Sequence, residues 1–248
     1  MTSENQLSNK YVREYYDAQV GVLTSYTDDR WHSSPLREFE YQQTKRALEK
    51  ALTGADYTNA VEIGPGDGVW TGLIKEHVSG SLHLVEQSQE MLARAKGRFS
   101  EVSGISFEHA DFLLSDPPRD NDLVIAIRCF EYFEDKEAAL IKMKNLLAPG
   151  GTLIIVTKNA QLATTTPVQH QTLHSDQLSR NQMTALATRA GFTMRHAYPA
   201  VLRWKAAYAP MRLLFNVLHH VGVWSRGALT VPFLTTYATE SYVYEMRA

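Results

Sequence analysis

Short apolar runs alternate along the chain with segments in which apolar residues recur every three or four positions. The short runs are rich in Val, Ile and Leu and are bounded by turn residues, which is typical of β-strands. They fall at residues 60–63, 81–86, 105–110, 122–127 and 152–157. The last two runs are apolar at nearly every position, which predicts strands that are covered on both faces of a sheet.

Helical patterns separate these runs. Residues 69–78, 88–99 and 136–147 each place their apolar side chains on one stripe, and Ser88 stands at the N-cap position of the second segment. Strands that alternate with helices predict parallel βαβ units. The fold class is therefore α/β, with a doubly wound sheet.

Two regions flank this alternating core. Before it, an aromatic-rich stretch leads into a long amphipathic helix over 35–52. After it, a loop over 159–174 precedes a helix that begins with Ser179 and Gln182 in capping-box positions. We expect one domain with a helical cap, a ligand-binding core, an insert and a last strand, over residues 1–53, 58–160, 160–235 and 240–248.

Composition and charge narrow the class of protein. The chain has 248 residues with a net charge of −2, which gives no general attraction for nucleic acid. Its single cysteine, Cys129, excludes an internal disulfide and fits a reducing cytoplasm. Its first residues are polar, and no apolar run approaches the ~18 residues of a membrane span. We therefore expect a cytoplasmic protein without a transmembrane segment.

A glycine-rich loop, "VEIGPGDGVW", follows the first strand. Gly64, Pro65, Gly66 and Gly68 bring the backbone to the carboxyl edge of the sheet, where ligands bind. Val69 stands where a dinucleotide fingerprint has Gly or Ala, and no GK[ST] follows as a P-loop requires. The loop therefore favours a ligand without phosphates.

Acidic residues at the strand ends narrow the ligand further. Glu62 lies within the first strand, where a buried carboxylate suits a positive amine or a backbone N–H. Glu86 ends the second strand, where a carboxylate can accept hydrogen bonds from both hydroxyls of a ribose. Asp111 can accept the amine of adenine while Phe112 packs on the base. These positions predict an adenosine with an amino-acid end.

Five segments resemble, in order and spacing, the class I S-adenosylmethionine-dependent methyltransferases. They are "VEIGPGDG", "LVEQS", "HADF", "DLVIAIRCFEYFED" and "LLAPGGTLIIVT", and they cover residues 58 to about 160. The resemblance implies a Rossmann-like seven-stranded sheet of order 3-2-1-4-5-7-6 with strand 7 antiparallel. Strands six and seven then fall at 192–200 and 240–248.

The resemblance also implies S-adenosyl-L-methionine as the cofactor. Its motifs carry over to this chain position by position and surround the methionine, ribose and adenine parts of the cofactor in turn. The residues implied are Glu62, Gly64, Gly66 and Arg128 for methionine, Glu86 for the ribose, and Gln87, Asp111 and Phe112 for the base.

Aromatic residues of the N-terminal cap are candidates for a lid. Methyl transfer displaces a sulfonium, and alignment with exclusion of water supplies much of the acceleration. Tyr15, Tyr16, Tyr26 and Trp31 can close over the cofactor, because aromatic faces suit a cation. The alternative is that some of them only pack the cap on the sheet.

A general base is needed only if the acceptor must lose a proton. His170 and His174 lie in the loop after the fifth strand, where either is a candidate base or an exposed loop histidine. Tyr132, after the fourth strand, is expected in the pocket. No HxxxH motif, His/Cys cluster or paired carboxylates indicate a catalytic metal.

These observations predict methyl transfer to a small molecule, with oxygen favoured. The near-neutral charge and the sequence "RCFEYF", where an NPPY motif would stand, argue against protein and nucleic-acid acceptors. The apolar segment 208–234 leaves four alternatives open: an apolar or lipid-linked acceptor, a weak membrane-surface contact, a homodimer interface, or a packed helix. The competing functions are a NAD-dependent oxidoreductase and a non-catalytic cofactor-binding homologue.

Overall fold

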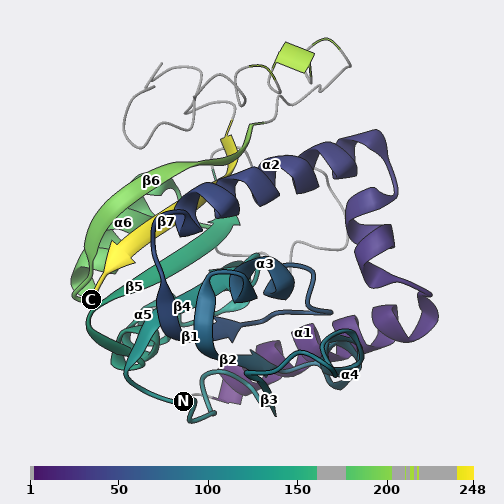
Figure 1. Ribbon diagram of the computed structural model, residues 1–248, viewed down its shortest axis with the longest axis horizontal. Coiled ribbons are helices and arrows are strands. Elements are labelled where there is room, and N and C mark those ends of the chain that lie inside the picture. The colour runs from purple at the N-terminus through teal and green to yellow at the C-terminus, as the bar shows by residue number, and fades with distance from the viewer. Residues whose placement is uncertain (1–2, 161–176, 203–209, 211–212, 215–216, 218–238) are drawn as a thin grey trace.

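The computed structural model describes residues 3–160, 177–202, 210, 213–214, 217 and 239–248. Its centre is a seven-stranded sheet of order β3-β2-β1-β4-β5-β7-β6 (Figure 1). The strands are β1 Tyr57–Ile63, β2 Val78–Glu86, β3 Ile105–His109, β4 Asn121–Ile127, β5 Leu147–Lys158, β6 Thr193–Leu202 and β7 Thr239–Arg247. All neighbours pair in parallel except β7, which is antiparallel to both β5 and β6. The predicted order and the antiparallel last strand are confirmed.

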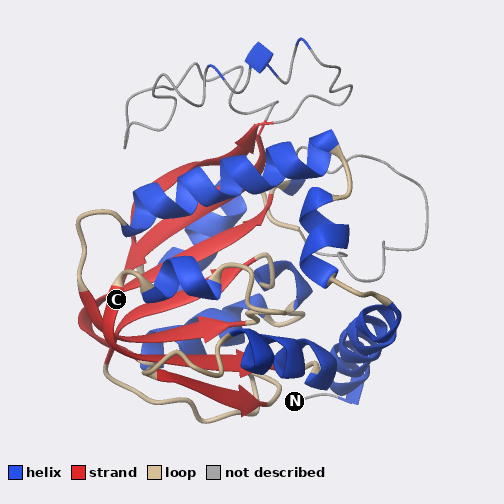
Figure 2. Ribbon diagram, turned by 45° about the vertical axis from the view of Figure 1, so that its right-hand side comes forward, coloured by secondary structure: helices blue, strands red, loops and turns tan. Residues whose placement is uncertain are grey.

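Helices cover both faces of this sheet (Figure 2). They are α1 Ser3–Val22, the π-helix η1 Asp28–His32, α2 Pro35–Leu52, α3 Thr71–Lys75, α4 Gln89–Arg98, the 3₁₀ turn η2 Phe130–Tyr132, α5 Lys136–Asn145 and α6 Arg180–Arg189. Helices α2 and α3 pack on one face and α5 and α6 on the other. The chain is thus a three-layer α/β sandwich.

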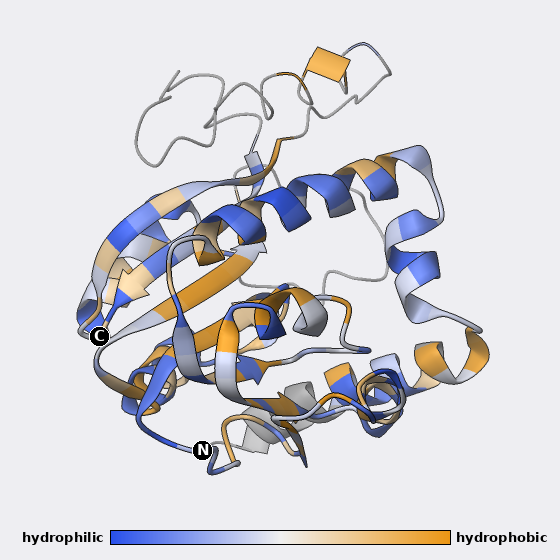
Figure 3. Ribbon diagram, viewed as in Figure 1, coloured by the Kyte–Doolittle hydropathy of each residue, from blue (hydrophilic) through white to orange (hydrophobic). Residues whose placement is uncertain are grey.

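The central strands are buried on both faces, as their unbroken apolar runs predict. In β4, Leu123 and Ile125 belong to the core under α2 and α3, whereas Val124 and Ala126 belong to the core under α5 and α6. All four side chains are fully buried. Figure 3 shows β4 and β5 among the most hydrophobic parts of the molecule.

Helix capping follows the sequence closely. The Ser88 side chain accepts a hydrogen bond from the Met91 N–H, and Ser179 and Gln182 form the predicted capping box. The helix predicted over 69–78 is wrong in extent, because α3 covers only Thr71–Lys75 and Val78 already begins β2. Val78 is buried against Tyr57 of β1, so its apolar side chain serves the sheet and not a helix stripe.

The N-terminal cap lies over the carboxyl edge of the sheet and is fastened to α4. The Arg94 guanidinium donates to the carbonyls of Val20, Leu23 and Thr24, at the end of α1. The Asp17 carboxylate accepts a hydrogen bond from the Ser88 hydroxyl at 2.5 Å. The cap is therefore held beside the loop that follows β2.

Some predictions lie outside the described residues. These are the loop positions His170 and His174 and most of the apolar segment 208–234. Among the helices that the structure describes, none combines the length and apolarity needed to cross a bilayer.

Candidate functional site

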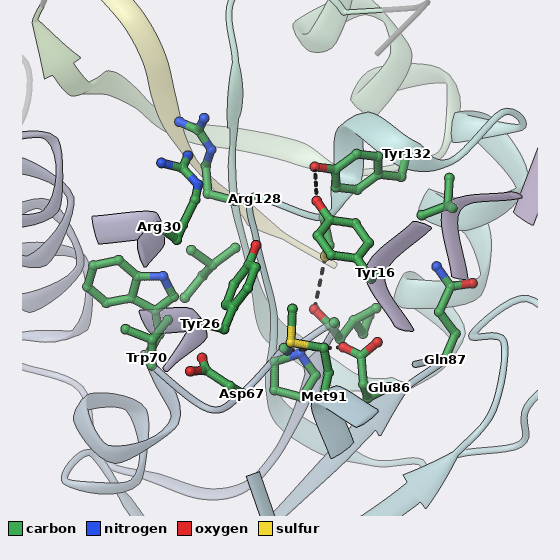
Figure 4. Close-up of a pocket in the computed structure, with 18 of the residues that line it drawn as sticks. Tyr16, Tyr26, Arg30, Asp67, Trp70, Glu86, Gln87, Met91, Arg128 and Tyr132 are labelled. Carbon is green, nitrogen blue, oxygen red and sulfur yellow. Dashed lines mark hydrogen bonds between the residues drawn. The ribbon is translucent and has the colours of Figure 1, made fainter. Parts of the chain in front are cut away.

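A cavity of about 530 Å³ opens at the carboxyl ends of β1, β2, β4 and β5 (Figure 4). The N-terminal cap forms its outer wall and the glycine loop after β1 forms its floor. Crevices at this edge of a doubly wound sheet are the usual ligand sites of the architecture. The volume lies within the range of about 300–1,000 Å³ of small-molecule pockets.

The glycine loop turns the backbone toward this cavity. Gly64 and Gly66 have φ angles of 63° and 60°, which side chains disfavour. A Cβ at Gly64 would lie 2.7 Å from Cys129 Cβ, whereas a Cβ at Gly66 would have only Met91 Sδ nearby, at 3.9 Å. Gly64 therefore allows close packing against Cys129, and Gly66 leaves room for a ligand.

Glu86 is buried at the end of β2 and lines the cavity. Its carboxylate accepts the Gly66 N–H at 3.0 Å on one oxygen and the Ser88 N–H at 2.9 Å on the other. Burial raises the pKa of this carboxyl, and the hydrogen bonds from the backbone at Ser88 and Gly66 oppose that rise. A carboxylate has about four acceptor positions, so Glu86 keeps acceptor capacity for ligand hydroxyls beside its backbone hydrogen bonds.

Glu62 lies behind the loop and not in the cavity wall. Its side chain is fully buried and accepts a hydrogen bond from the Thr71 hydroxyl at 2.7 Å. Burial raises the pKa of Glu62 to about 8. The residue thus fastens the start of α3 to β1 instead of touching a ligand directly.

The raised pKa of Glu62 makes stability depend on pH. An acid whose folded-state pKa lies above its unfolded value favours the native state below about 4.5, and this contribution is lost as pH rises toward 8. One pKa unit corresponds to about 1.4 kcal/mol. We expect Glu62→Gln to be more stable than wild type by a few kcal/mol at pH 8, with the gap shrinking at pH 4. Urea unfolding at both pH values measures this, and a constant gap would contradict the burial argument.

The residues predicted to hold the adenine base also line the cavity. Gln87 and Asp111 lie at the ends of β2 and β3, with Phe112 beside them. The Asp111 Oδ1 atom accepts the Leu113 N–H at 2.9 Å, which fixes the turn. The buried Phe112 ring packs on Phe133 with 5.8 Å between centroids. This end of the cavity therefore has an acceptor beside a rigid aromatic wall.

Three tyrosines lie over the glycine loop. The Tyr16 and Tyr132 hydroxyls are 2.5 Å apart, and the Tyr26 ring meets the Tyr16 ring edge-on. Burial raises the pKa of Tyr26 to about 12 and the pKa values of Tyr16 and Tyr132 further. All three therefore stay protonated at neutral pH and can donate hydrogen bonds, but they are poor general bases.

Arg128 directly follows β4 in an unusual backbone conformation, with φ of 60°. Its guanidinium donates to both carboxylate oxygens of Glu240, at 3.0 and 3.3 Å, and lies 3.5 Å from Glu131. Burial favours the neutral form of Glu240, but Arg128 and Lys158 outweigh it and lower its pKa to about 2. Arg128 thus lines the cavity while it ties β4 to β7.

The structure adds site residues that the sequence does not single out. Asp67 lines the cavity, accepts the Thr27 hydroxyl at 2.5 Å, and pairs with Arg98 at 3.3 Å. Its second oxygen, Oδ1, is buried and has no hydrogen-bond partner among the described residues. Arg30 and Lys158 also face the cavity. Asp67 stands inside the glycine motif, but no sequence pattern marks Arg30 or Lys158.

Most of the predicted site residues meet in this one cavity. Its lining includes Tyr16, Tyr26, Gly64, Pro65, Gly66, Glu86, Gln87, Asp111, Phe112, Arg128 and Tyr132. Gly68 instead supports the wall from behind, where a Cβ would lie 2.6 Å from the Phe99 ring. Gly68 and Glu62 are thus predicted site residues that the structure describes but that do not line the cavity.

Comparisons with known proteins agree with this geometry. Residues 61–153 match the model of a methyltransferase domain. Over 112 residues, 45% of the chain, the sequence is 30% identical to an uncharacterized methyltransferase of Mycobacterium tuberculosis, covering 56% of that protein. Over 128 residues, 50% of the chain, it is 27% identical to trans-aconitate 2-methyltransferase of Rhizobium meliloti, covering 49% of that protein. The chain spans about half the length of the curated relatives it matches.

Solved structures extend the likeness to the whole fold. The N-methyltransferase NodS of Bradyrhizobium japonicum, in complex with S-adenosylhomocysteine, has a TM-score of 0.64 at 16% identity, over 95% of this chain and 97% of its own. The complex of DhpI with the same ligand has a TM-score of 0.66 at 17% identity, over 100% and 98%. The predicted class I methyltransferase fold is confirmed.

Proposed function

We propose that this chain is a class I S-adenosylmethionine-dependent methyltransferase and that it methylates a small-molecule acceptor, with oxygen as the favoured atom. The observation that carries the proposal is the position of Glu86. Its carboxylate ends β2, lines the cavity and is held by the Gly66 and Ser88 N–H groups. A carboxylate in this position suits the two hydroxyls of a ribose.

The remaining lining residues suit the other parts of S-adenosylmethionine. Gln87, Asp111 and Phe112 offer polar groups and an aromatic wall to the adenine. The buried Oδ1 of Asp67 can accept the α-ammonium group, since it has no partner among the described residues. The open space beside Gly66 leaves room between these two ends.

The reaction needs alignment more than acid–base chemistry. Bound S-adenosylmethionine supplies an electrophilic methyl group on a sulfonium. Tyr16, Tyr26 and Tyr132 present aromatic rings around that part of the cavity, and rings of this kind stabilise a cation. The cap, fastened through Arg94 and Asp17, forms the outer wall of the same space. Positioning of this kind accounts for much of the acceleration of a displacement reaction.

A small-molecule acceptor has independent support. The net charge of −2 disfavours nucleic acid. Trans-aconitate, named for the rhizobial relative, is a small molecule. To test the acceptor class, the protein is incubated with methyl-labelled S-adenosylmethionine and, separately, with small-molecule, protein and nucleic-acid fractions of a cell extract. We expect label in the small-molecule fraction. Label only in macromolecules contradicts the acceptor class, and cofactor binding without transfer indicates the non-catalytic homologue.

Two histidines that follow β5 in the sequence, His170 and His174, are our candidates for a general base. If either acts as one, His170→Ala or His174→Ala should lower turnover by about 10²–10⁴-fold, the usual contribution of such a group. Cofactor affinity should stay unchanged, which calorimetry with S-adenosylhomocysteine checks. Full turnover in both variants eliminates a histidine base.

A further inference from the structure

One end of the cavity gathers positive charge. Four cationic side chains line it, and three carboxylates lie among them; the cations are Arg30, Arg37, Arg128 and Lys158, and the carboxylates are Glu40, Glu131 and Glu240. We call this group the cationic end. In Figure 4, Arg30 and Arg128 point into the same region, across Tyr16 from Gln87. The cationic end thus lies away from the place proposed for the adenine.

Two of the four cations are well paired within the protein. Arg128 holds Glu240 with two hydrogen bonds, and Arg37 lies 3.2 Å from the Glu40 carboxylate. The two-pronged Arg128–Glu240 pair is strong, although Arg128 Nε is buried without a hydrogen bond, and Arg37 is exposed to solvent. These two guanidinium groups therefore depend less on a ligand than the other two cations do.

Arg30 and Lys158 are poorly paired. The Arg30 guanidinium lies 4.3 Å from the centre of the Trp31 ring, but its Nη1 is buried without a hydrogen bond. Nη1 comes only within 3.9 Å of Glu40, which Arg37 already contacts. Within the described part of the chain, Lys158 Nζ has no hydrogen bond and no carboxylate within 4.0 Å. Burial and the nearby Arg128 lower the pKa values of both groups, as expected where cations crowd together. The exposed Asp29, also in the lining, does not compensate at this depth.

The proposed cofactor brings no net negative charge to the cationic end, and here the inference rests on the proposed function. The ammonium and carboxylate groups of S-adenosylmethionine cancel, and its sulfonium adds one positive charge. Buried cations are costly unless an anion accompanies them. Arg30 and Lys158 are half-buried, and a second substrate that carries an anionic group would supply the counter-charge.

We infer that the methyl acceptor carries a carboxylate, which Arg30 and Lys158 hold. Arg30 belongs to the π-helix η1, a rare element that often occurs at functional sites, and its planar fork fits a carboxylate. Lys158 ends β5, next to the carboxyl end of β4 where Arg128 lies. The two residues act as determinants of acceptor specificity.

Calorimetry on the complex with S-adenosylhomocysteine tests this inference. The probes are the dicarboxylate succinate and its uncharged diamide, succinamide, at constant ionic strength. Tricarballylate is a third probe, which is larger and carries three carboxylates. We expect one succinate or tricarballylate per chain and at least tenfold weaker binding of succinamide. Arg30→Gln and Lys158→Gln should each weaken carboxylate binding at least tenfold and change the affinity for S-adenosylhomocysteine less than twofold.

The exposed Lys96 of α4 provides the matched control, since Lys96→Gln removes one positive charge that does not line the cavity. This variant should bind both probes as wild type does. The inference is overturned if neither carboxylate binds better than succinamide, or if the two variants lose affinity for S-adenosylhomocysteine and not for the carboxylate. Failure of the wild type to bind S-adenosylhomocysteine at all would contradict the proposed function instead.

Discussion

Replacing Glu86 by alanine is expected to weaken the binding of S-adenosylhomocysteine at least tenfold. The variant would lack the two charge-assisted hydrogen bonds that the Glu86 carboxylate accepts from the ribose, each worth about 1.5–3 kcal/mol. A tenfold change corresponds to about 1.4 kcal/mol, so the expected minimum is below the loss of one such bond. Calorimetric titration of wild type and variant measures the change.

Two further variants separate ribose binding from a loosened loop. Glu90→Ala removes an exposed carboxylate four residues away in α4 and should leave affinity unchanged. Glu86→Gln keeps one oxygen for the Gly66 or Ser88 N–H, so it should fold like wild type while it binds the ligand more weakly. If Glu86→Ala binds as tightly as wild type, the ribose lies elsewhere.

The second large effect contrasts two glycines of the same loop. Gly64→Ala places a side chain at a positive φ, which costs about 1–2 kcal/mol. Its Cβ would also lie 2.7 Å from Cys129 Cβ, and overpacking of this kind destabilises a core by about 1–3 kcal/mol. Gly66→Ala has only the strain of φ, because its Cβ enters open cavity. We expect urea unfolding to show the larger loss of stability for Gly64→Ala, and calorimetry to show a loss of cofactor affinity for Gly66→Ala beyond its modest loss of stability.

Removing the opposing side chain checks the cause of the Gly64 effect. The nearest atom is the Cβ of Cys129, so Cys129→Ala keeps the clash and Cys129→Gly removes it. The double variant Gly64→Ala/Cys129→Gly should be less destabilised than the sum of its single variants. Strict additivity would show that Cys129 does not limit this position.

Much of the fold is predictable because its determinants are local. The apolar runs of β4 and β5, the cap at Ser88 and the capping box at Ser179 each depend on a few neighbouring residues, and the structure has all of them. The helix predicted over 69–78 is wrong in extent because the apolar side chain of Val78 packs in the sheet. There Val78 pairs with Tyr57 of β1, which lies 21 residues earlier in the sequence. Periodicity cannot distinguish a side chain buried by a helix from one buried by a strand.

The site residues also fall into those that a local motif predicts and those that only the fold brings together. Gly64, Gly66 and Glu86 belong to motifs with fixed spacing, so their position in one cavity follows from the sequence. The cationic end does not, because it brings together residues from distant parts of the chain: Arg128 and its partner Glu240 are 112 residues apart. Single charged residues such as Lys158 carry no periodic signal and usually indicate a solvated surface.

Calorimetric titration of the wild-type protein with S-adenosylhomocysteine, beside a parallel titration with NADH, tests the central claim most directly. The cavity formed by the glycine loop, Glu86 and the three tyrosines should bind one S-adenosylhomocysteine per chain, and NADH should bind far more weakly or not at all. Tighter binding of NADH would favour an oxidoreductase on the same sheet. The absence of any affinity for S-adenosylhomocysteine would contradict the account.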